Sequence, residues 1–232
     1  MAMSPRLLRP RSAGGFDPRR LTGLVAWWDG TDSSTINLDN NGGVELWRDK
    51  SGLSRTAAQT TANNRPTLGT LAGKQAVAFD ATDDFLTLNT SPNSGEETLF
   101  IVFNGLPGRQ IFGSTRLYFN ASGNLIENPY AGFTAGTNRL QLSTTAGASR
   151  YIYGSRIGPT GATAASTTTA ASMANSATAT STATGRIQFF SIMSLSSSAL
   201  GGAIGEVLIY NRAMSDAEFY AVEAYLLRKW PV

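Results

Sequence analysis

The sequence predicts an all-β fold, an antiparallel β-sandwich that closes with one α-helix. Short apolar segments recur at a spacing of roughly ten residues, separated by turn residues, which is typical of sandwiches and barrels. The final segment has the period of a helix instead. A length of 232 residues suits one domain of this class. We therefore expect a single domain over residues 21–232.

The expected strands follow one another from residue 23 to residue 212. Residues 99–103 are apolar at every position, which favours a central strand buried on both faces. Residues 116–128 have the pattern of a hairpin, because Asn120 to Asn124 supply turn chemistry. Further strands are expected within residues 23–30, 43–52, 74–88, 138–144, 149–155, 185–195 and 202–212.

The predicted helix covers residues 215–230. Ser215 and Glu218 have the spacing of a capping box, which satisfies two amides at the helix start. Arg228 and Lys229 complement the negative end of the helix dipole. One face is apolar and carries Phe219, Val222, Leu226 and Trp230.

Residues 160–184 are Ala, Ser or Thr at 22 of 25 positions, and this composition has two interpretations. The segment is either a flexible surface loop or a strand with a close-packing face, suited to a neighbouring subunit. The strand interpretation rests on residues 177–184, where small and β-branched residues alternate.

Residues 1–20 are expected to form an extended basic arm, because Pro and Gly residues oppose helix and strand there. The segment holds five Arg and one Asp, whereas the other 212 residues hold fourteen basic and fifteen acidic residues. The basic character therefore belongs to the arm. Such an arm binds an anionic partner or is only a solubilising terminus. The candidate partner-binding residues are Arg6, Arg9, Arg11, Arg19 and Arg20.

The chain has no Cys and no His. Disulfides, thiol catalysis and the commonest general base and metal ligand are therefore excluded, and we expect no cofactor. The first residues contain no apolar stretch of signal-peptide length, and no segment approaches the length of a membrane span. We therefore expect a protein that is made in a cytoplasm and does not bind membranes.

Several motifs occur in an order that resembles the laminin-G-like, concanavalin A-like jelly-roll domains. The first block contains "GLVAWWDGTDSSTI", "VELWRDKSG", "RPTL" and "VAFDATDDFLTL", and the last is "GAIGEVLIYNRAMSDAEFYAVEAYLLRKW". These blocks cover about residues 21–90 and 186–230, and residues 91–185 carry no such motif. The resemblance implies a jelly-roll fold, which occurs in secreted bacterial proteins, sugar binders and phage particle proteins.

The motif residues have structural and functional interpretations side by side. Trp27, Trp28 and Trp47 are expected in the core, with sugar stacking as the alternative. Asp80, Asp83 and Asp84 are expected to accept backbone amides in a turn, and a cation site is the weaker interpretation. The candidate sugar-stacking residues are Trp28, Tyr130 and Tyr151.

Nothing in the sequence has the pattern of a catalytic site, and we expect a protein that is not an enzyme. The Glu-x-Asp-x-x-Glu string of related β-glucanases is absent. Glu96 and Glu97 are neighbours, so they would face opposite sides of a strand. Glu206 stands alone among apolar residues.

The expected function is that of a structural protein in a phage particle. A jelly roll of a usually exported type, with a basic arm and no export signal, suits a capsid decoration (cement) protein assembled in the host cytoplasm. The arm would bind the major capsid protein, and a homo-trimer is compatible with this role. The alternative is a tail- or fibre-associated module that binds host glycans. Nucleic-acid binding is disfavoured, because the arm lacks interleaved aromatic residues for base stacking and the rest of the chain is about neutral.

Overall fold

The computed structural model describes eleven stretches of the chain. They are residues 15–90, 96–105, 110–112, 117–119, 125–127, 140–142, 147–158, 161–167, 175–180, 191–192 and 201–231.

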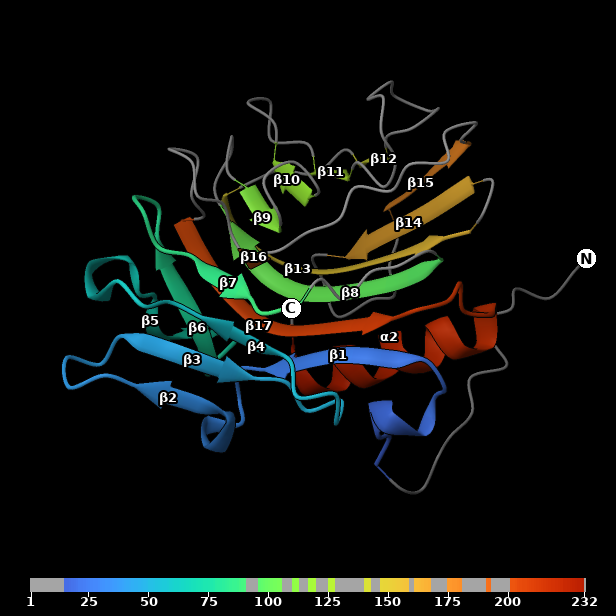
Figure 1. Cartoon of the computed structure of the whole chain (residues 1–232). Coiled ribbons are helices and arrows are strands. Elements are labelled where there is room, and N and C mark those ends of the chain that lie inside the picture. The colour runs from blue at the N-terminus through green and yellow to red at the C-terminus, as the bar shows by residue number, and fades with distance from the viewer. Residues whose placement is uncertain are drawn as a thin grey trace, which may run out of the picture.

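The strands of these stretches form two antiparallel sheets, which confirms the predicted all-β sandwich (Figure 1). The first sheet has the order β15-β14-β13-β8-β17-β6-β5, with β1 paired to the end of β17. Its strands are β1 (Leu24–Asp29), β5 (Thr67–Leu71), β6 (Lys74–Asp80), β8 (Glu97–Gly105), β13 (Gly147–Ile157), β14 (Gly161–Thr167), β15 (Asn175–Thr180) and β17 (Gly201–Tyr210).

The second sheet has the order β12-β11-β10-β9-β16-β7-β4-β3-β2. Its strands are β2 (Ile36–Leu38), β3 (Val44–Arg48), β4 (Thr56–Ala58), β7 (Leu86–Leu88), β9 (Gln110–Phe112), β10 (Leu117–Phe119), β11 (Leu125–Glu127), β12 (Leu140–Leu142) and β16 (Ser191–Ile192). Three 3-10 turns connect strands or precede them: η2 (Pro18–Arg20), η3 (Ser33–Thr35) and η4 (Ala62–Asn64).

The central strands β8 and β17 of the first sheet are buried on both faces. Leu99, Ile101 and Phe103 of β8 point into the core between the two sheets, whereas Phe100 and Val102 belong to a second core beneath the C-terminal helix. The apolar run at residues 99–103 therefore forms the predicted central strand. The molecule has three layers, with the helix on one side of the first sheet and the second sheet on the other (Figure 1).

The predicted helix is present as α2 (Asp216–Lys229), and Ser215 and Glu218 form the capping box. Arg212 donates to both carboxylate oxygens of Glu218, at 2.6 and 2.9 Å. The helix approaches the sheet closely enough to require glycine. A Cβ at Gly205 of β17 would lie 2.7 Å from the ring of Trp230. None of the described helices is long and apolar enough to cross a membrane.

Strands are present in the expected hairpin at residues 116–128 and in the segment at residues 160–184. The hairpin expected at 116–128 is confirmed where β10 pairs with β11. In the segment rich in Ala, Ser and Thr, β14 pairs with β13 and β15 pairs with β14. The strand interpretation, which rested on residues 177–184, is thus confirmed for residues 177–180 within β15, while residues 181–184 lie outside the described residues. The strand β14 was not predicted, and the proposed subunit contact stays a prediction.

The end of the expected extended arm is corrected by the structure. Residues 1–14 lie outside the described part, but Phe16 and Pro18 pack on the domain. The Phe16 ring lies 5.4 Å from that of Tyr225. Pro18 is buried, and its carbonyl accepts a 3.1 Å hydrogen bond from the hydroxyl of Tyr210. Apolar and backbone contacts therefore outweigh the basic, Pro-rich composition at residues 16–20.

Replacing Phe16 by Ala should lower the free energy of unfolding by about 1–2 kcal/mol, because a partly buried ring loses its contact with Tyr225. Urea denaturation followed by tryptophan fluorescence measures this change. Arg20→Ala is the control, since Arg20 is exposed in the same turn. Equal stability of both variants and the wild type would show that Phe16 is not part of the folded domain.

Candidate functional site

The candidate arm residues separate into two groups. Arg6, Arg9 and Arg11 lie outside the described residues. Arg19 is used within the domain, because its guanidinium pairs with Asp17 at 2.8 Å and lies 5.8 Å from the Trp27 ring centre. Arg20 is exposed.

Of the three candidate sugar-stacking residues, the structure describes the side chain of Trp28. Trp28 is completely buried in the core between the sheets, so it offers no face to a sugar and this interpretation is wrong. Trp27 and Trp47 are buried too, which confirms the core expectation for all three. Tyr151 lies on β13 opposite Phe103, but its side chain is outside the described part, as is all of Tyr130.

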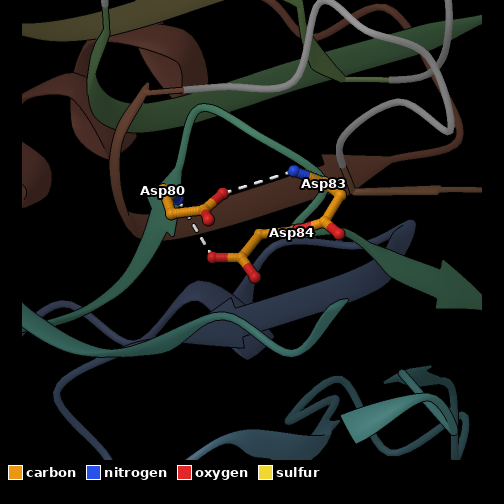
Figure 2. A group of neighbouring side chains, drawn as sticks. All are labelled: Asp80, Asp83 and Asp84. Carbon is orange, nitrogen blue, oxygen red and sulfur yellow. Dashed lines mark hydrogen bonds between the residues drawn. The ribbon is translucent and has the colours of Figure 1, made fainter. Parts of the chain in front are cut away.

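Asp80, Asp83 and Asp84 do meet, in the turn between β6 and β7 (Figure 2). One carboxylate oxygen from each lies within 4.8 Å of the others. Asp80 Oδ1 accepts from the amides of Thr82 and Asp83, at 2.8 and 3.3 Å. Asp84 Oδ2 accepts from the amide of Asp80 at 3.0 Å. The expected structural turn is therefore confirmed.

The environments of these carboxyl groups differ strongly. Asp84 is 5% exposed, and its burial, together with the charge of Asp80, raises its pKa to about 6. Desolvation works in the same direction at Asp80, but the amides of Thr82 and Asp83 outweigh it and hold the pKa of Asp80 below its usual value. Carboxylate oxygens are the ligands of hard cations, but three are fewer than the six to eight oxygens around calcium. The contacts described here are those of a turn.

A second cluster, which the sequence interpretation missed, surrounds Glu206 in the middle of β17. The residue is 1% exposed. Its Oε1 accepts from the indole of Trp27 at 2.8 Å and from the hydroxyl of Tyr225 at 2.7 Å. Its Oε2 accepts from the indole of Trp230 at 2.7 Å and pairs with Lys229 Nζ at 2.9 Å.

Lys229 links this carboxylate to another one. Its ammonium also binds Asp29 Oδ1 of β1 at 2.6 Å, and Lys50 binds the other oxygen of Asp29 at 2.9 Å. Burial opposes ionisation of Asp29, but Lys229, Thr31 and Lys50 hold its pKa below the ordinary value. At Tyr225, burial and the adjacent Glu206 carboxylate raise the pKa of the phenol. We call Asp29, Lys50, Glu206, Tyr225 and Lys229, with the two indoles, the Glu206 network.

The Glu206 network joins α2 to β1 and β17 and faces the interior. Both oxygens of Glu206 already have two partners, so this carboxylate has no free position for a substrate. In the sequence, the only indication of the Glu206 network is an acidic residue inside the apolar string "GAIGEVLIY". A charge at such a position requires buried partners, but their identity depends on the fold.

No protein-family model matches the chain, and no curated protein matches it. Solved structures do. One is a Trypanosoma rangeli sialidase in complex with 2,3-difluorosialic acid, with a TM-score of 0.57, 13% identity, 95% of this chain covered and 34% of that one. An arabinofuranosidase complexed with arabinofuranosyl-alpha-1,2-xylobiose has a TM-score of 0.52 and 14% identity, with 91% and 60% covered. A second, a GH54 arabinofuranosidase, has a TM-score of 0.54 and 13% identity.

These neighbours contradict the expectation that the chain is not an enzyme, because they are glycoside hydrolase chains. The expectation rested on the absence of one β-glucanase motif, whereas the fold is shared with hydrolases that the motif does not describe. The chain spans about a third of the sialidase and 60% of the arabinofuranosidase. At this identity the likeness shows the fold, a β-sandwich found within carbohydrate-active chains.

Glu206→Gln should lower the free energy of unfolding by about 3–5 kcal/mol, because it removes one of the two carboxylates that balance the ammonium groups of Lys50 and Lys229 in the network. Denaturant unfolding at neutral pH measures the loss. Glu45→Gln is the matched control, since it makes the same change where the Glu45 side chain is 52% exposed. If both variants lost equally little, Glu206 would not hold the layers together.

Proposed function

We propose that this chain is a carbohydrate-recognising β-sandwich domain. The observation that carries the proposal is that nearly the whole chain superposes on parts of chains crystallised with a sialic acid derivative or an arabinofuranosyl-xylobiose. The ligand class is therefore a glycan, and these two sugar types are the first to test.

The described surface offers carboxylates that such a ligand can use. Asp80 and Asp83 are exposed at the β6–β7 turn, where carboxylates can accept hydrogen bonds from sugar hydroxyls. Tyr130 and Tyr151 remain the candidate stacking residues, because an aromatic face beside polar groups is the usual composition of a sugar site.

Binding to a glycan array that includes sialosides and arabino-oligosaccharides is the expected result. Sugar release from the same compounds, followed by chromatography, shows whether recognition leads to hydrolysis. Tyr151→Ala should weaken binding at least about tenfold if this ring stacks on the sugar, and Tyr220→Ala, on the helix α2, serves as the control. An array without signal above background would contradict the proposal.

We also propose attachment to a phage particle, as a decoration protein or as part of a tail fibre, with the glycan face turned outward. The docking of Phe16 to Arg20 supports this second proposal, because it fixes the point from which residues 1–14 leave the domain. Arg6, Arg9 and Arg11 would then pair with carboxylates of a particle protein such as the major capsid protein. Deleting residues 1–14 should abolish incorporation into particles while the domain stays folded, and unchanged incorporation would contradict this role.

A further inference from the structure

The β6–β7 turn is a joint between the two sheets. Asp80 ends β6 in the first sheet, where it pairs with Gly201 of β17. Leu86 begins β7 in the second sheet, where it pairs with Ile192 of β16. Residues 81–85 connect them, so any change in this turn acts on both layers (Figure 1).

Anionic and neutral groups surround the Asp84 carboxyl. Among the described residues, the charged groups that act on it are Asp80 and Asp83 (Figure 2). The neighbouring segments contribute neutral groups to the turn, since Asn64 and Gln59 bond the backbone of Phe85. The nearby cation, Arg65, pairs instead with Asp39 and Glu45.

The free-energy cost of burying the Asp84 carboxyl beside Asp80 and Asp83 depends on whether Asp84 is ionised. With all three groups ionised, a buried carboxylate has like charges within 4.8 Å and no cation beside it among the described residues. With Asp84 protonated, the repulsion disappears, and its second oxygen can carry a proton toward a neighbouring carboxylate while Oδ2 still accepts from the amide of Asp80.

We propose that the Asp80–Asp83–Asp84 cluster makes the β6–β7 turn a proton-dependent clamp, which tightens the joint between the two sheets when the solution becomes mildly acidic. The clamp acts in the free domain and requires no bound glycan or particle protein.

The sign follows from linkage. The pKa of Asp84 is about 6 in the folded protein, whereas an Asp in the unfolded chain has a pKa of 3.8. The folded state therefore binds the proton more tightly. The stabilisation is fully present below pH 3.8 and is lost as pH rises through 6. The pKa of Asp80 is shifted downward, so Asp80 stays ionised across this window.

Urea unfolding of the full chain between pH 4.5 and 7.5, with a chelator present, tests the clamp. From pH 7.5 to 4.5, the folding equilibrium of the wild type should gain about 25-fold relative to Asp84→Asn, because pH 4.5 lies well below the folded pKa of about 6 but still above the unfolded value of 3.8. Glu45→Gln, an exposed carboxylate with the same charge change, should follow the wild type. Parallel pH curves for wild type and Asp84→Asn would overturn the proposal.

A titration of the wild type keeps the test independent of any variant's folding. The carboxyl carbon resonance of Asp84, followed by NMR, should titrate near pH 6. The hydrogen-exchange protection factors of residues 79–88, which are corrected for the intrinsic pH dependence of exchange, should rise as the pH falls through the same range. Titration near the ordinary value for Asp, about 4, would overturn the clamp.

Discussion

The structure depends on one buried carboxylate, Glu206. Removing a charge from water is costly unless several donors compensate it. Glu206 has four such donors. Trp27 of β1 supplies one, Tyr225 and Lys229 in the last two turns of α2 supply two, and Trp230, which follows the helix, supplies the fourth. The two indoles, the phenol and the ammonium can meet it only when helix, edge strand and central sheet are in register. The network thus specifies how α2 sits on the sheet, a task that apolar contacts alone leave less defined.

The burial of Glu206 also explains why Trp27 and Trp28 point to opposite faces of β1. Since Trp27 must reach Glu206 on the helix side, Trp28 points into the core between the sheets, and both faces of β1 are committed to the interior. Neither Trp27 nor Trp28 is therefore available to a ligand at the surface.

Local signals in the sequence were sufficient for the elements whose pattern is self-contained. The capping box and apolar face of α2, and the continuous apolar run of β8, require no knowledge of partners. The opposite holds for Trp28, Glu206 and Asp84. Their roles depend on which segment covers them, and a strand buried on both faces lacks the alternation that would reveal it. The docking of Phe16 could not be predicted for the same reason, because its aromatic partner Tyr225 lies more than two hundred residues away in the sequence. The absence of one β-glucanase motif could not exclude an activity either, because the fold also occurs in hydrolase chains that lack this motif.

A double-mutant cycle between Glu206 and Lys229 tests the role of this network most directly. Glu206→Gln, Lys229→Met and the double variant are compared with the wild type by denaturant unfolding. If the pair fixes α2 on the sheet, the coupling free energy should be about 1–3 kcal/mol, since the double variant no longer leaves one charge buried without the other. Additive effects, with a coupling below about 0.5 kcal/mol, would show that the helix is held by apolar packing and that Glu206 is not the residue on which the fold depends.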